Sequence, residues 1–158
     1  MNTVADSTAS VAMGHTTQSG GVGSFAGGWN TQAIADGAFA FGFSSNKGNL
    51  SANTKGAIAM GDAEKTGTIT ASGQGSVAIG IAQDGKKLTS SGFGSVALGV
   101  NTTASNSADT ATGCNTIASG GNSFAMGHTT QATGNASVSY GRETLAKHSN
   151  SLAGGQGT

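Results

Sequence analysis

The pentapeptide Ser76-Val77-Ala78-Ile79-Gly80 determines the fold, because segments of this form, Ser-apolar-Ala-apolar-Gly, recur ten times with small variations. The ten closing glycines are Gly14, Gly28, Gly42, Gly61, Gly80, Gly99, Gly113, Gly127, Gly141 and Gly155. Successive closing glycines are 14 residues apart, except for three consecutive spacings of 19. A fixed period of this kind indicates a repeat architecture, so we expect one array of stacked units over residues 1–158.

A second short run follows each closing glycine. In the 14-residue units it begins with a threonine and continues two residues later with a small residue, as in Thr102 and Ala104. Both runs favour strands, and a glycine after every apolar run disfavours helix. Two strands and two turns make one coil. The sequence therefore predicts an all-β fold, a parallel β-roll (a β-solenoid) of about ten coils of 14 to 19 residues.

The first strand of each coil is apolar on both faces. Val77 and Ile79 share one face and Ala78 lies on the other, because neighbours in a strand point to opposite sides. A two-stranded coil has a single interior, so the second apolar face needs a partner, and the simplest partner is another copy. We expect the small alanine column to provide this inner-strand and subunit packing. The column comprises Ala12, Ala26, Ala40, Ala59, Ala78, Ala97, Ala111, Ala125 and Ala153.

Three consecutive units carry five extra residues each, which gives insertion-bearing coils over residues 43–99. The extra residues lie in the loops 43–49, 62–68 and 81–87, and neighbouring coils should stack these loops into one lobe. The lobe is either a binding face or a solvated embellishment. The threonine column changes there to Leu50, Ile69 and Leu88. The charged candidates for ligand binding are Lys47, Asp62, Glu64, Lys65, Asp84, Lys86 and Lys87.

The residue after each closing glycine is the most variable one of the repeat, which suggests an outward position. Trp29 and Phe43 occupy this position in consecutive coils. We expect them to be exposed neighbours that anchor a partner, or else to pack against the lobe.

Composition excludes several functions. The formal net charge is zero, so nothing favours nucleic acid or an anionic membrane surface as a partner. A single cysteine rules out an internal disulfide. No nucleophile elbow or phosphate-binding loop occurs, and His15 and His128 lie too far apart to share a metal within one chain. We therefore expect a protein that is not an enzyme and holds neither a cofactor nor a metal.

Two other solenoid functions are weak alternatives. The threonine column could order water in an ice-binding solenoid, although Leu50, Ile69 and Leu88 interrupt it. A polysaccharide lyase would need longer coils with acidic or basic clusters.

The two strand columns resemble the YadA-like head repeats of trimeric autotransporter adhesins. Ser76-Val77-Ala78-Ile79-Gly80 is a full match and Asn122-Ser123-Phe124-Ala125-Met126-Gly127 a close one, and the resemblance covers essentially the whole chain in phase. The polar segment Asp109-Thr110-Ala111-Thr112-Gly113 and the 19-residue units depart from the pattern. Both ends of the chain fall within repeats, so we expect a segment of a longer array.

The resemblance implies a left-handed β-roll, three chains around one axis, and display on the outer membrane of a bacterium. It further implies attachment to host cells or to matrix proteins such as collagen and fibronectin, without membrane contact by this segment. The alternative is a segment of a phage or injection-machine tail fibre that binds a cell-surface receptor, because similar repeats occur there.

Overall fold

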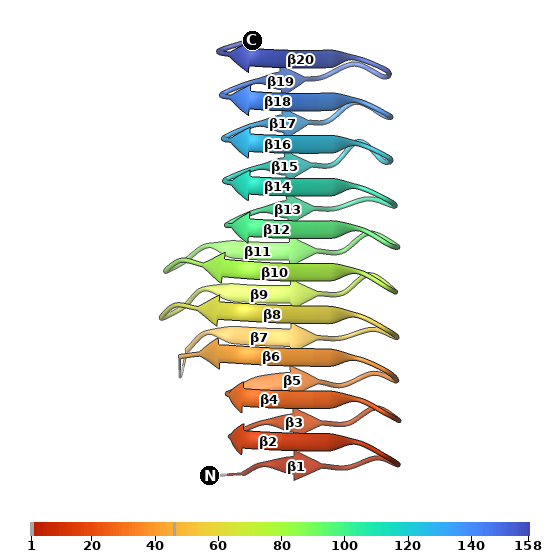
Figure 1. Ribbon diagram of the computed structural model, residues 1–158, viewed down its shortest axis with the longest axis vertical. Coiled ribbons are helices and arrows are strands. Elements are labelled where there is room, and N and C mark those ends of the chain that lie inside the picture. Colours follow the sequence, from red (N-terminus) through yellow and green to blue (C-terminus); the bar gives the residue numbers. More distant parts are fainter. Residues whose placement is uncertain (1, 46) are drawn as a thin grey trace.

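The computed structural model describes residues 2–45 and 47–158, and these residues form two parallel β-sheets of ten strands each without any helix. The strands alternate between the two sheets along the chain (Figure 1). The odd sheet contains β1 (Val4–Ala5), β3 (Gln18–Ser19), β5 (Thr31–Ala33), β7 (Asn49–Ala52), β9 (Thr68–Ala71), β11 (Lys87–Ser90), β13 (Thr103–Ala104), β15 (Ile117–Ala118), β17 (Gln131–Ala132) and β19 (Leu145–Ala146). The even sheet contains β2 (Val11–His15), β4 (Phe25–Trp29), β6 (Phe39–Ser44), β8 (Ile58–Ala63), β10 (Val77–Ala82), β12 (Val96–Val100), β14 (Thr110–Cys114), β16 (Phe124–His128), β18 (Val138–Arg142) and β20 (Leu152–Gln156).

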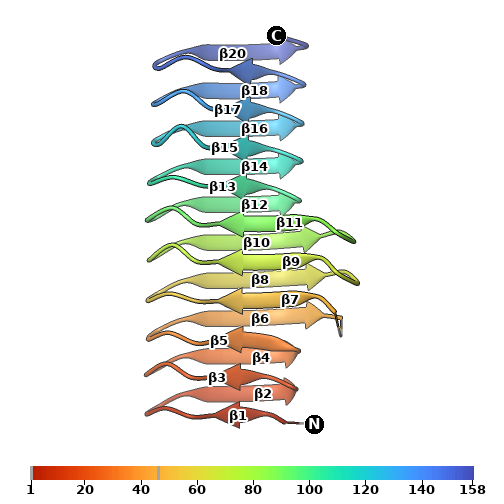
Figure 2. The ribbon, with the colours of Figure 1, turned by 180° about the vertical axis from the view of Figure 1, so that it is seen from behind.

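Each coil contributes one strand to each sheet, and the coils stack into a straight rod with the two chain ends at opposite tips (Figures 1 and 2). Strands of consecutive coils pair in the register of the repeat, so that Ala78 lies beside Ala97 and Gly80 beside Gly99. The predicted β-roll is therefore confirmed, and each sequence column becomes a straight row on the rod.

Two features require glycine at the end of each repeat: its positive φ, and the absence of room for a Cβ between neighbouring coils. Gly80 has a φ of +145°, and a Cβ at this position would overlap the carbonyl oxygen of Gly99 in the next coil. A side chain in this row would separate neighbouring coils, which explains why the glycine recurs.

The alanine row faces the interior between the two sheets. Ala78 and Ala97 are fully buried within a single chain, as are Ala26, Ala40, Ala59, Ala111 and Ala125. Ala12 and Ala153 belong to the two terminal coils and are partly exposed. The prediction that this row forms the surface between chains is therefore wrong.

The physical reason is the width of the coil. Two strands joined by tight turns leave a narrow interior, which admits methyl groups and hydroxyls but no large side chains. The bulkier apolar residues of the even sheet therefore point outward, and they form the apolar face that a single chain leaves open. The threonine column of the repeat, which includes Thr17 and Thr102 directly before β3 and β13, is also fully buried. Its threonines do not contact water, which removes the basis of the ice-binding alternative.

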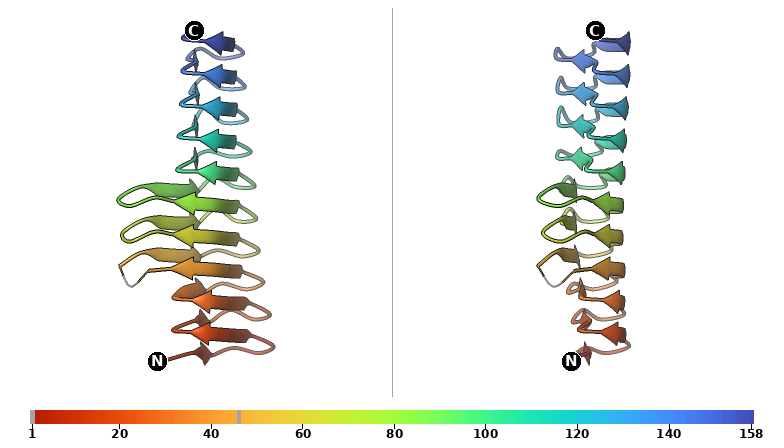
Figure 3. Two further views of the ribbon diagram at one scale, coloured as in Figure 1. Left: turned by 60° about the vertical axis from the view of Figure 1, so that its left-hand side comes forward. Right: turned by 90° about the vertical axis from the view of Figure 1, so that its left-hand side faces the viewer.

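The three long coils widen the rod locally. Strands β6, β8 and β10 extend by one residue beyond the five-residue strands of the even sheet, and β7, β9 and β11 are longer than the other odd strands. The loops that connect them project to the same side and lie one above another (Figure 3). Leu50, Ile69 and Leu88 are fully buried in this wider part. The prediction of one stacked lobe is confirmed for the described residues, and we call the loops 43–49, 62–68 and 81–87 the lobe, of which residue 46 lies outside the described part of the chain.

Candidate functional site

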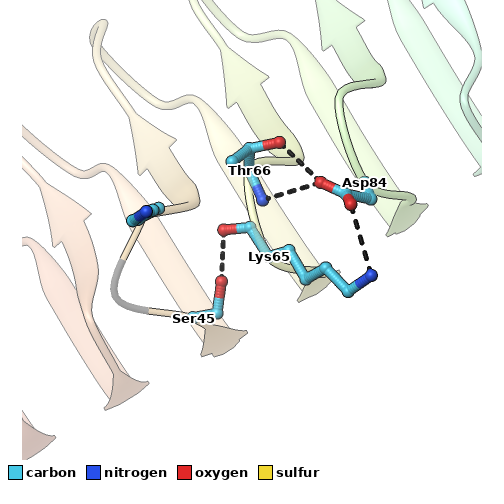
Figure 4. Close-up of a pocket in the computed structure, with 5 residues that line it drawn as sticks. Ser45, Lys65, Thr66 and Asp84 are labelled. Carbon is cyan, nitrogen blue, oxygen red and sulfur yellow. Dashed lines mark hydrogen bonds and ion pairs between the residues drawn. The ribbon is translucent and has the colours of Figure 1, made fainter.

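The lobe carries an open surface cavity of about 450 Å³. Its lining residues come from all three loops: Ser45 and Lys47 from the first, Lys65 and Thr66 from the second, and Asp84 from the third (Figure 4). Residues almost forty positions apart in the sequence thus meet because consecutive coils stack in register.

Hydrogen bonds join the three loops around this cavity. The Thr66 hydroxyl donates to Asp84 Oδ1 over 2.6 Å, and Lys65 Nζ lies 3.3 Å from Asp84 Oδ2. The Ser45 hydroxyl donates to the Lys65 carbonyl oxygen, and the Gly85 amide donates to Thr66 Oγ1 over 3.0 Å. The loops therefore form one connected unit (Figure 4).

Asp84 is the electrostatic centre of this unit. The hydrogen bond from the Thr66 hydroxyl, followed by the contact with Lys65, lowers the pKa of the Asp84 carboxyl below its ordinary value of 3.8. Both partners favour the ionised carboxylate. The cavity consequently presents an ion pair between Lys65 and Asp84 together with the ammonium group of Lys47.

The structure divides the predicted ligand-binding residues among four places. Lys47, Lys65 and Asp84 line the cavity. Lys87 lines a different depression, on the outer face of the odd sheet. Glu64 and Lys86 are exposed on the loops, outside the lining of either depression.

Sequence reasoning did not include Ser45 and Thr66 in the site. Both are uncharged loop residues, and their importance arises from side-chain contacts with the next coil. Their position inside the insertions was the one signal that could have identified them.

Trp29, Phe43 and Asp62 form the fourth group, a row at one edge of the outer face of the even sheet. The ring of Trp29 stacks on His15 with a centroid distance of 3.7 Å and meets Phe43 at 6.1 Å. Trp29 is 38% exposed and Phe43 48%, so the expectation of exposed neighbours is confirmed. Asp62 follows Phe43 in register, and its buried Oδ1 has no hydrogen-bond partner within the described residues.

The same outer face of the even sheet is mostly apolar along the rod, with Thr110 and Thr112 of β14 as exceptions. Exposed large side chains recur from coil to coil: Val11, Met13, Phe41, Leu98, Met126, Tyr140 and Leu152. Phe25 and Phe39 stack at 5.0 Å beside them. Gly27 leaves room for this aromatic cluster, because a Cβ there would lie 2.8 Å from the rings of Phe25 and Phe41. A long, exposed apolar surface of this kind marks a site of protein association.

Within residues 2–45 and 47–158, no group of three or more His, Cys, Asp or Glu side chains could hold a metal ion. The same residues include no helix with the length and hydropathy needed to cross a membrane.

Comparison with known families identifies the repeat. The model of the YadA head domain repeat (2 copies) matches residues 5–31, 70–82, 90–116 and 118–144, which is more than half of the chain. No curated protein matches the sequence. The first two loops of the lobe, 43–49 and 62–68, lie outside the matched residues, so the lobe is the part in which this chain departs most from the family pattern.

Proposed function

Because the chain belongs to the YadA head family of surface-exposed, structural adhesin domains, we propose that it is the head segment of a bacterial adhesin. In this role it attaches the cell that displays it on its outer membrane to host matrix proteins or host cells. The observation that carries the proposal is the family match to repeats that form a rigid rod in this structure.

The proposed active form is a homotrimer that packs through the outer face of the even sheet. Heads of this family form trimers in general. This chain carries a suitable surface, because Phe41, Leu98 and Met126 belong to an open apolar strip along the rod, which only the threonines of β14 interrupt within the described residues. Covering such a strip with two further copies removes apolar area from water and stabilises each coil.

The proposed attachment surface is the lobe together with the aromatic pair beside it. The cavity offers Lys47 and the Lys65–Asp84 ion pair. Trp29 and Phe43 lie near the ends of β4 and β6, at the edge of the even sheet next to the lobe. In the proposed trimer this edge stays outside the packed strip, so the two rings offer exposed aromatic area of the kind that anchors protein partners. Collagen and fibronectin are the candidate ligands to test first.

The experiment compares the native chain with a trimmed chain in which each of the three long coils loses its five extra residues. Both are applied to surfaces coated with collagen, fibronectin or albumin. We expect the native chain to bind at least one matrix protein and the trimmed chain to lose most of that binding. Sedimentation and circular dichroism check that the trimmed rod still folds and assembles.

Equal binding by the two chains would remove the lobe from the proposal and move attachment to the shaft of the rod. Failure of the native chain to bind any matrix protein or cultured host cells would contradict the proposed function itself.

A further inference from the structure

The outer face of the odd sheet carries a furrow that neither the lobe cavity nor the apolar face includes. The furrow crosses β7, β9 and β11 and has a volume of about 380 Å³. This face points away from the even sheet, so it remains open when copies pack through the even sheet (Figure 3). Two parallel rows of side chains line the furrow: Asn49, Thr68 and Lys87 in one, and Ser51, Thr70 and Thr89 in the other.

The row of polar side chains continues in register along the rod, since Ser51 pairs with Gln32 and Gln32 with Gln18. These two glutamines line a second, separate depression of about 350 Å³ on the same face, and its lining also includes Val4 and the carboxylate of Asp6. A ligand lying along the rod axis would therefore meet amide and hydroxyl groups in successive coils from β3 to β11.

The hydroxyl groups of the furrow are accessible from solvent. Ser51, Thr70 and Thr89 line the depression, and none of their hydroxyls is among the buried polar atoms that lack a partner in the described part of the chain. Water therefore serves these hydroxyls in the free protein, and a ligand with hydroxyl groups of its own can take the place of that water.

The chemistry of the lining disfavours several classes of ligand. Of the described residues that line the furrow over β7, β9 and β11, Lys87 alone carries a charge, so a nucleic acid or a sulfated polymer finds no cationic track. The backbone groups of these strands already pair with neighbouring strands, which prevents a peptide from adding to the sheet. The lining also lacks the apolar anchors that a helical partner needs.

We propose that this furrow binds an extended, uncharged polysaccharide strand. Such a strand presents hydroxyl groups along its whole length, and hydroxyl and amide side chains can both donate to and accept from them. The lining rows repeat at the spacing of neighbouring strands, about 4.8 Å, so successive sugar units can contact equivalent groups in successive coils. Lys87 donates to a neutral oxygen of the sugar.

The test measures binding of the complete chain to hexasaccharides of glucose with β1-4 or α1-4 linkage, of xylose, and of hyaluronan, by titration calorimetry and on a glycan array. The variant Thr70→Val/Thr89→Val removes two hydroxyls and keeps the branched shape. We expect binding of at least one neutral hexasaccharide, and an affinity at least tenfold lower for this variant. Thr110→Val makes the same change on the even sheet and should leave the affinity unchanged.

Three results would overturn the proposal. The first is no binding of any neutral hexasaccharide by the native chain, and the second is an unchanged affinity of the double variant. The third is binding of hyaluronan alone that Lys87→Gln abolishes, because this would mean recognition of charge. Thermal melting of the variants shows that they fold. Attachment through the lobe is measured on matrix proteins, so either proposal can fail while the other holds.

Discussion

At the scale of single residues, Asp109 replaces the serine that usually stands directly before each strand of the even sheet. The usual serine stabilises the turn before it through two hydrogen bonds. The Ser24 hydroxyl donates to the Gly21 carbonyl and accepts from the Gly21 amide. Asp109 is fully buried and accepts hydrogen bonds from the Asn106 amide and from the amide and hydroxyl of Ser123. The polar unit that departs from the repeat pattern is therefore held to the following coil by a buried carboxylate.

Replacing Asp109 by alanine should lower the free energy of unfolding by about 3 kcal/mol, since several buried donors lose their acceptor at once. Asp109→Ser restores the usual residue of the column and should cost about 1 kcal/mol. Urea titration of both variants measures the difference. Equal losses would mean that the contacts of the carboxylate with the next coil are unimportant.

The buried threonines allow a second prediction at this scale. Thr116 Oγ1 is buried without a hydrogen-bond partner in the described residues, whereas Thr144 Oγ1 bonds Ser139 and the Tyr140 carbonyl. Thr116→Val should therefore be neutral or stabilising by up to about 1 kcal/mol, and Thr144→Val should be destabilising by about 1 kcal/mol. Melting temperatures of the two variants test the opposite signs, and a loss of stability in both would contradict the reasoning.

At the scale of elements, the inserted loops differ from the tight turns in what holds them. In short coils a threonine hydroxyl can reach back to a carbonyl four residues earlier, as Thr31 does to Gly27. In the long coils the turn lies farther out, and Leu50, Ile69 and Leu88 fill the space instead. Contacts between neighbouring loops, centred on Asp84, then order the lobe.

The lobe network should weaken in acid. The folded pKa of Asp84 is lowered, so its contribution to the network is present above the ordinary pKa of aspartate and is lost as pH falls through the lowered value. A pH titration of the Thr66 amide signal by NMR should show a midpoint below 3.8, and Thr66→Val should raise it. A midpoint at the ordinary value in the native chain would mean that the hydrogen bond from Thr66 is not formed in solution.

The recurring positions of the repeat predicted the coils, the pairing register of the strands and the position of the lobe, because all three follow from the spacing of the closing glycines. They did not predict which face of the even-sheet strands lies in the interior of the coil. Alternation places Ala78 and Val77 on opposite faces but does not say which faces the second strand, and the small volume of alanine decides it. The contacts of Ser45 and Thr66 also escaped prediction, since they depend on side-chain geometry between coils.

At the scale of the whole molecule, the open apolar face predicts self-association. The native chain should sediment with three times its single-chain mass of 15.1 kDa. Phe41→Glu/Met126→Glu places charges on this face and should give single chains, because a buried, unpaired carboxylate in each interface is costly.

The matched control is Gln32→Glu/Gln131→Glu, which adds the same charge to the outer face of the odd sheet and should leave the mass unchanged. Circular dichroism verifies that all three chains fold. A native chain that stays single at micromolar concentration would contradict the proposed trimer.

The stacking of coils has a mechanical consequence. The ladder hydrogen bonds run along the rod and the chain ends lie at opposite tips, so a pull between the ends detaches one coil at a time (Figure 1). Each freed 14-residue coil turns about 4.8 Å of rod into roughly 48 Å of extended chain. Optical tweezers should record stepwise extensions of equal length for the 14-residue coils and three longer steps for the 19-residue coils. Such a rod lengthens under load before it breaks.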